Sequence, residues 1–202
     1  MITLRRAFQT TRHTRRSFFL TLATLTSAAV VAGHAADAMN MPDAISRPPA
    51  TRIFVSPAGH YKLTIENRDN WQTQETVADL KEIEGDAART AWQQTLPHRM
   101  GPRAALVTDN GEVVLIDEWI NSPSPYALSE IDVRGTTIAR YGLDQLIAAL
   151  AVDRRAVSDN ARVGIWMSGP PVVRSDGASV EFRCAGKRFS LRLSDGTLSI
   201  DS

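Results

Sequence analysis

Three short segments near the end of the chain alternate apolar and polar residues with a period of two. Val180, Phe182 and Cys184 alternate with charged residues, and the same pattern returns at 189–193 and at 198–200. Ala-Gly and Asp-Gly pairs separate the three segments. Because successive side chains of a β-strand point to opposite faces, each segment has one apolar face. The sequence therefore predicts three short antiparallel strands joined by tight turns.

A β-hairpin is predicted at residues 104–119. Two runs of mainly aliphatic residues, 104–108 and 112–119, flank Asp109-Asn110-Gly111. An Asn-Gly pair between such runs is the strongest short-range signal for a hairpin. Further strands are predicted from alternation and from flanking turn residues, at 53–55, 61–65, 72–83, 89–96, 126–133 and 136–141.

One amphipathic helix is predicted near 143–153. Leu143, Leu146 and Leu150 repeat with helical spacing, and Arg154-Arg155 stands where the dipole at the end of a helix favours cations. The predicted fold class is mainly β, with antiparallel meanders that form a sandwich, a curved sheet or a small barrel, together with this helix.

Residues 1–38 have the composition of a cleavable signal peptide. The segment is rich in arginine, and the uncharged run 17–33 is diluted by hydroxyl residues, so it falls short of the about 20 strongly apolar residues that a membrane span needs. Small residues at Ala36 and Ala38 predict cleavage before Met39, and cleavage after Ala35 is the alternative.

The rest of the chain divides into a tether and a domain. Residues 39–51 contain three prolines and no apolar period, which predicts a flexible tether. Residues 52–202 are expected to form a single β-rich globular domain, which could comprise sub-modules 52–155 and 160–202.

The arginine pair of the leader resembles the twin-arginine signal of bacterial export. Thr14-Arg15-Arg16 and Phe18 match the pattern Ser/Thr-Arg-Arg-x-Phe-Leu-Lys, and Leu20 departs from its last position. The resemblance implies recognition of Arg15, Arg16 and Phe18 by the export machinery, and export in the folded state, often with a cofactor already loaded. An ordinary cationic leader of the general secretory route is the alternative. Either route predicts a periplasmic or secreted protein.

Cleavage of the leader would change the charge of the chain. After residues 1–38, 18 basic and 21 acidic residues remain, so the formal net charge falls from +1 to −3. A weakly acidic domain without clustered Lys or Arg is not expected to bind nucleic acid or an anionic membrane. Cys184 is the only cysteine, which excludes an intramolecular disulfide.

A second resemblance concerns one turn. Ser56-Pro57-Ala58-Gly59 is similar to the Ser-Pro-Asp-Gly turn of β-propeller blades, with Ala58 in place of the acid, and residues 90–92 and 107–114 are similar to blade segments as well. The likeness covers about sixty residues, whereas a closed propeller needs at least four blades of about 40 residues. It therefore implies a β-meander turn and no functional residue.

Chemistry based on histidine would depend on His60 or His98, because no other histidine follows residue 38. Both are expected in loops, where a histidine is usually a solvated polar residue. The sequence has no Gly-x-Ser-x-Gly, His-Glu-x-x-His, Cys-x-x-Cys or phosphate-loop motif, which disfavours four common enzyme classes.

The remaining candidates are acidic or aromatic. Asp109, Asp117 and Glu118 lie on the predicted hairpin, but adjacent strand residues point to opposite faces, and an Asp in a turn usually bonds its own backbone. Cys184 is predicted to be a small buried hydrophobe. The four tryptophans are expected in the core rather than on a ligand platform: Trp71, Trp92, Trp119 and Trp166.

No catalytic, cofactor-binding or metal-binding residue is assigned from the sequence. The leading hypothesis is an exported envelope protein with a non-catalytic binding or accessory domain. The alternatives are a periplasmic hydrolase that uses Asp117 or Glu118 with His98, and an exported carrier of a cofactor.

Overall fold

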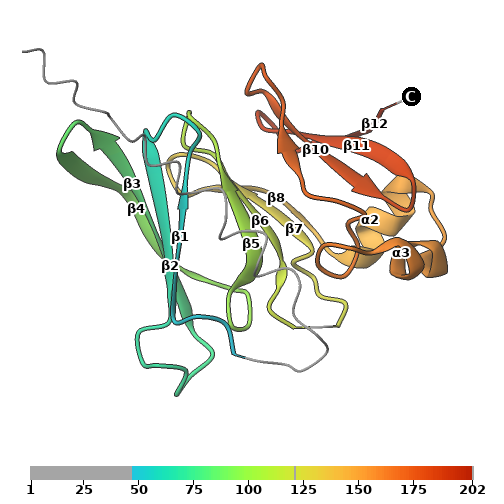
Figure 1. Cartoon of the computed structure of the whole chain (residues 1–202), viewed down its shortest axis with the longest axis horizontal. Helices are drawn as coiled ribbons and strands as arrows, with labels where there is room; N and C mark the ends of the chain where they lie inside the picture. The colour runs from blue at the N-terminus through green and yellow to red at the C-terminus, as the bar shows by residue number, and fades with distance from the viewer. Residues whose placement is uncertain (1–46, 121, 202) are drawn as a thin grey trace, which may run out of the picture. The chain divides into compact units, whose positions relative to one another are not determined.

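The computed structural model describes residues 47–120 and 122–201, and these residues form antiparallel β-sheets with two short helices. The predicted leader with Arg15, Arg16 and Phe18, and most of the expected tether, lie outside the described residues. The mainly β fold class predicted from the sequence is confirmed (Figure 1).

In the described residues, twelve strands form three sheets of four strands. The N-terminal sheet contains β1 (Thr51–Val55), β2 (Tyr61–Glu66), β3 (Thr76–Glu84) and β4 (Ala87–Leu96). The central sheet contains β5 (Pro102–Val107), β6 (Val113–Glu118), β7 (Leu128–Ile131) and β8 (Thr137–Tyr141). The C-terminal sheet contains β9 (Val172–Val173), β10 (Ser179–Cys184), β11 (Lys187–Arg192) and β12 (Leu198–Ile200).

Each sheet is a simple meander, because strands that follow one another in the sequence pair side by side. In the turn between β1 and β2, Gly59 has a φ of 80°. The described residues provide three such sheets, one fewer than the four blades that a small propeller needs.

The central sheet packs on both faces, as the strand β6 shows. All six residues of β6 are buried, whereas a strand with one solvated face alternates between buried and exposed residues. Val113 and Leu115 join one hydrophobic cluster with Leu63 and Leu80 of the N-terminal sheet. Val114 and Ile116, which alternate with them on β6, belong to a second hydrophobic cluster with residues of the C-terminal sheet and the helices.

The second cluster is centred on aromatic side chains. The ring of Trp166 lies 5.7 Å from that of Phe182 and 5.8 Å from that of Phe189, and all three side chains are fully buried. Aromatic groups of this size contribute much of the apolar area that a core removes from water. The indole therefore connects the C-terminal sheet to the segment that precedes it.

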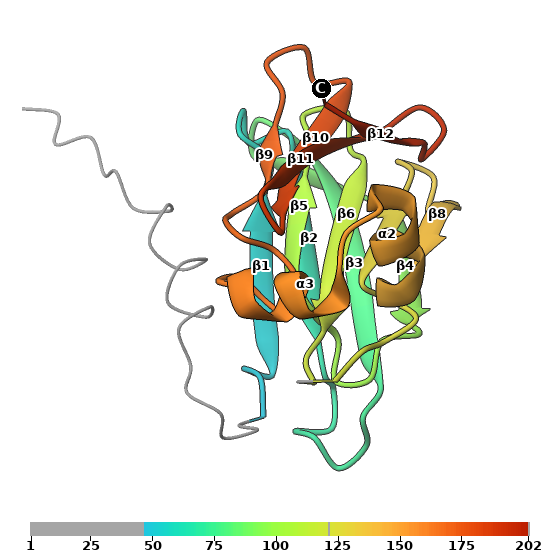
Figure 2. The same cartoon turned by 90° about the vertical axis from the view of Figure 1, so that its right-hand side faces the viewer.

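The helix predicted near 143–153 is confirmed, and a second helix that the sequence did not predict follows it. Helix α2 (Leu143–Leu150) ends at Ala151, whose φ of 48° interrupts the helical backbone. Helix α3 (Arg154–Asn160) begins after Asp153, whose carboxylate accepts hydrogen bonds from two backbone N–H groups of the first turn. Arg154 and Arg155 therefore start a second helix rather than end the first (Figure 2). No helix in the described part of the chain is long and apolar enough to cross a membrane.

Candidate functional site

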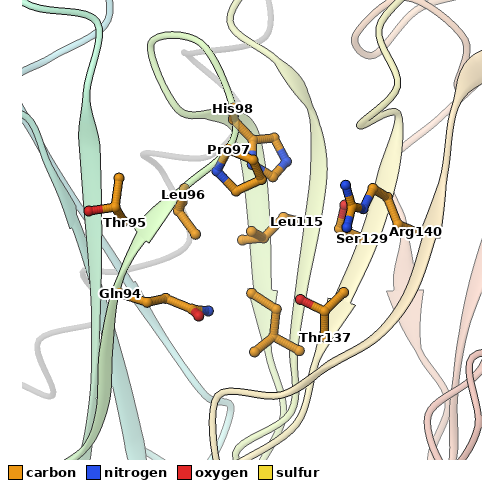
Figure 3. Close-up of a pocket in the computed structure, with 10 residues that line it drawn as sticks. Gln94, Thr95, Leu96, Pro97, His98, Leu115, Ser129, Thr137 and Arg140 are labelled. Atoms are coloured by element: carbon orange, nitrogen blue, oxygen red, sulfur yellow. The ribbon is translucent and has the colours of Figure 1, made fainter.

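A small polar cavity lies between the N-terminal and central sheets, and His98 lines it (Figure 3). His98 follows the end of β4, where Pro97 ends the strand pairing. The loop then turns through Met100 and Gly101, which both have positive φ values, of 57° and 77°. The Gly101 N–H donates to the His98 carbonyl at 3.2 Å, and the Trp119 N–H donates to the Gly101 carbonyl at 3.0 Å. The loop is therefore tied to the end of the central sheet.

The imidazole of His98 is buried, in contrast to the solvated position expected from the sequence. The residue is 2 % exposed, and its ring lies 5.0 Å from the ring of Tyr126. Neither ring nitrogen has a hydrogen-bond partner among the described residues. Burial, followed by the positive charges of Arg140 and Arg52, lowers the pKa of His98 from 6.5 to about 3. The side chain is therefore neutral at physiological pH.

The opposite wall of the cavity is a row of residues across the central sheet. Leu115 of β6 pairs with Ser129 of β7, and Ser129 pairs with Arg140 of β8, so the three side chains lie on one face of the sheet. The Ser129 hydroxyl is buried and has no hydrogen-bond partner in the described structure. The Arg140 guanidinium lies 5.4 Å from the centre of the Tyr126 ring, which places it beside His98.

The cavity has a volume of about 50 Å³. This is room for one or two water molecules, or for one small chemical group of a larger ligand. Figure 3 shows Gln94 of β4 and Thr137 of β8 on opposite sides of the space. The cavity is lined by ten residues: Gln94, Thr95, Leu96, Pro97, His98, Leu115, Ser129, Ile131, Thr137 and Arg140. Among them, Arg140 is the only one with a formal charge, and none carries a carboxylate.

Asp117 and Glu118 point in different directions, as their adjacent positions on β6 predict. Asp117 accepts a hydrogen bond from the Ile165 N–H at 3.1 Å, on the side of the C-terminal sheet. Glu118 accepts one from the Arg99 N–H at 2.6 Å, at the loop that carries His98. Neither carboxylate lines the cavity of His98, so the structure does not assemble the set that the hydrolase hypothesis requires.

Asp117 is the more unusual of the two carboxyl groups. Its backbone has a φ of 52°, and its side chain is fully buried. Burial raises the pKa of Asp117 from 3.8 to about 7, although the bond from Ile165 and the charge of Arg103 oppose the rise. A Cβ atom at Gly164 would collide with this carboxylate, so a glycine is required where the chain passes Asp117. These contacts give Asp117 a structural role.

Asp109 was predicted to accept a hydrogen bond from the backbone of its own turn, and this prediction is wrong. Its Oδ1 accepts a hydrogen bond from the Ala58 N–H at 2.7 Å, rather than from its own turn. The turn is instead closed by Thr108, whose Oγ1 accepts from the Glu112 N–H at 3.1 Å. Asp109 therefore joins the β1–β2 turn to the β5–β6 turn, between two sheets.

The remaining candidates from the sequence do not join the cavity. His60 is exposed at the β1–β2 turn. The expectation that the four tryptophans lie in the core is confirmed, since each is at most 8 % exposed. Arg52 and Arg103 lie 5.1 Å and 5.9 Å from the ring of Trp119. Cys184 is buried, as predicted, and burial raises the pKa of its thiol to about 11.

Sequence reasoning missed three polar residues, namely Ser129, Glu130 and Arg140. Glu130 is fully buried on β7, and neither of its oxygens has a hydrogen-bond partner among residues 47–120 and 122–201. Burial, followed by nearby acidic residues, raises its pKa from 4.5 to about 7. Strand β7 reads Leu-Ser-Glu-Ile, so half of its residues are polar and the sequence gives no signal that Glu130 is buried. No group of three possible metal-binding side chains occurs in the described structure.

Comparison with known proteins does not identify a family for this chain. No protein family matches the sequence, and no curated protein matches it. A crystal structure of HIRA(644-1017) is similar in part, with 16% sequence identity and a TM-score of 0.31. The match covers 76% of this chain and 53% of that chain, so the chain spans about half the length of the matched protein.

Proposed function

We propose that this chain is an exported bacterial envelope protein whose β-rich domain binds a ligand without catalysing a reaction. The observation that supports binding is the cavity of His98, where buried polar groups face a space and lack partners among the described residues. Buried polar groups in native proteins are nearly always hydrogen-bonded, so two ring nitrogens and a hydroxyl at one cavity point to an occupant.

The composition of the cavity supports binding over catalysis. A general base works best when its pKa lies near the operating pH, and the pKa of His98 lies far below that range. No carboxylate lines the cavity to orient the imidazole or to act as a second acid. The periplasmic hydrolase is the second candidate, because Glu118 contacts the N–H of Arg99, next to His98.

Hydrolysis assays separate these two functions. The purified chain is incubated with generic ester, peptide and glycoside substrates, and the His98→Ala and His60→Ala variants are matched controls. We expect no saturable hydrolysis by any of the three proteins. Saturable hydrolysis that disappears in His98→Ala and persists in His60→Ala would overturn the proposal in favour of the hydrolase.

The proposal also covers the cellular location of the protein and a bound cofactor. The leader with Arg15, Arg16 and Phe18 would engage the export machinery, and the mature chain would be periplasmic or secreted. The twin-arginine resemblance also motivates a search for a bound cofactor, because proteins exported in the folded state often carry one. An absorbance spectrum and an intact mass of the exported protein test it, because a bound chromophore adds an absorbance band and a covalent group adds mass.

A further inference from the structure

We infer that the cavity of His98 binds a compact oxyanion, namely a carboxylate or phosphate group at one end of a small ligand. The inference rests on the proposed binding function and adds the chemical class of the ligand. It follows from which groups line the cavity, from the charges around it and from its size.

The cavity offers hydrogen-bond donors and one positive charge. Arg140 carries five N–H donors in a planar arrangement that matches the two oxygens of a carboxylate. Ser129 and Thr137 each have a hydroxyl that can donate, and neutral imidazole donates from one ring nitrogen. An anion could therefore replace water at each of these groups with a stronger, charge-assisted hydrogen bond.

The charges near His98 also favour an anion. Arg140 lines the cavity, and Arg52 is close enough to act on the imidazole. Both guanidinium groups disfavour a further positive charge in this space, and the same field stabilises a negative one. Arg52 is itself held in place, since it donates to the Pro102 carbonyl and lies over Trp119. Its charge is thus held in a fixed position near the cavity, although Arg52 does not line it.

The size and the opening of the cavity limit the ligand. A volume of about 50 Å³ holds one head group and leaves no room for the rest of a larger ligand. Thr95, Thr137 and Arg140 are exposed, so the cavity opens to solvent between β4 and β8. The head group would lie beside His98 and Ser129, and the rest of the ligand would extend across this opening.

Nuclear magnetic resonance of the imidazole groups tests the inference on the full chain. The His98 signal is assigned by its loss in His98→Gln, and His60 serves as an internal control. Acetate, inorganic phosphate and neutral acetamide are titrated separately at constant ionic strength. We expect acetate or phosphate to shift the His98 signal saturably, with no shift for acetamide and none for His60. The anion that binds more tightly distinguishes a carboxylate from a phosphate ligand.

Two arginine variants identify the charge that binds. Arg140→Gln should weaken anion binding by about tenfold or more, because a hydrogen bond to a charged group contributes about 1.5–3 kcal/mol and tenfold corresponds to 1.4 kcal/mol. Arg134→Gln is the matched control, since Arg134 is 80% exposed, pairs with Asp132 and does not line the cavity. The Arg134→Gln variant should bind acetate and phosphate with unchanged affinity. Ser129→Ala gives a second, milder loss.

Three results would overturn the anion site. An equal shift with acetamide would mean that the cavity binds polar groups regardless of charge, and the proposed binding function would still stand. Unchanged anion affinity in Arg140→Gln would remove the argument from charge. No response of His98 to acetate or phosphate would mean that water fills the cavity, and the hydrolysis assays would still test the proposed function independently.

Discussion

Asp117 accepts a hydrogen bond from the backbone N–H of Ile165 at 3.1 Å, across 48 residues of sequence. The contact connects the central sheet to the segment that leads into the C-terminal sheet. Asp117 can make it because its backbone has a φ of 52°, a conformation that Asp and Asn adopt more readily than other side chains with a Cβ. Ile165 also lies next to Trp166 in the second hydrophobic cluster.

Replacement of Asp117 should therefore destabilise the fold. Asp117→Ala leaves the Ile165 N–H without its acceptor and puts alanine in a left-handed conformation, which together should lower the free energy of unfolding by about 2–3 kcal/mol. Asp117→Asn keeps an acceptor and tolerates the backbone, so its loss should be smaller. Urea denaturation measures both. Equal losses in the two variants would contradict a role for this hydrogen bond.

The buried carboxyl of Glu130 should make stability depend on pH. Its pKa is raised from 4.5 to about 7 in the folded chain, so the folded state holds a proton that the unfolded state releases between these values. Its effect on stability is absent below the lower value and grows unfavourable as the pH rises toward the higher one. The raised pKa of Asp117 also makes the fold less stable as the pH rises.

Glu130→Gln should remove this part of the pH dependence. We expect the free energy of unfolding of the variant to rise by about 1–2 kcal/mol at about pH 8 and almost not at all at about pH 4. Each pKa unit corresponds to about 1.36 kcal/mol, and local relaxation around the ionised carboxylate reduces the full effect. Glu66→Gln, at a glutamate paired with Arg68 near the surface, is the control. The same gain at both pH values would show that ionisation of Glu130 is not its cause.

Much of the fold was predictable because strand formation depends on local patterns. The alternation of Val180 and Phe182 and the Asn-Gly turn at residue 110 each specify a hairpin without reference to distant residues. The same topology arises in all three sheets without a detectable sequence repeat, since alternation and turn residues are enough for a meander. The break between α2 and α3 was missed because Ala151 carries no signal for a positive φ.

The candidate site was less predictable, because it depends on distant pairings. Ser129 and Arg140 become neighbours only through the β7–β8 register, and that register includes an irregularity between Glu130 and Ile131. The position of His98 in the loop was predicted, but its burial depends on packing against Tyr126. A loop histidine in a sequence gives no sign of such packing.

The boundary between the helices gives a local prediction. The Asp153 carboxylate accepts hydrogen bonds from the Arg155 N–H at 2.8 Å and the Ala156 N–H at 3.2 Å. Asp153→Ala should lower the free energy of unfolding by about 1 kcal/mol, because it removes this cap. Asp159→Ala, at an exposed residue near the other end of α3, should have a smaller effect. Thermal denaturation of both variants measures the difference, and equal effects would argue against the cap.

The pair Arg15-Arg16 in the predicted leader gives a test of the location of the protein. Only a twin-arginine route reads the guanidinium groups of Arg15 and Arg16, whereas the general secretory route reads positive charge, which lysine keeps. The Arg15→Lys, Arg16→Lys double variant should therefore lose export, measured as processed protein in the periplasmic fraction. Arg5→Lys with Arg6→Lys is the matched control, because it changes a second arginine pair of the same leader. Normal export of both variants would favour the general secretory route, and retention of both would mean that the leader needs arginine at more than one place.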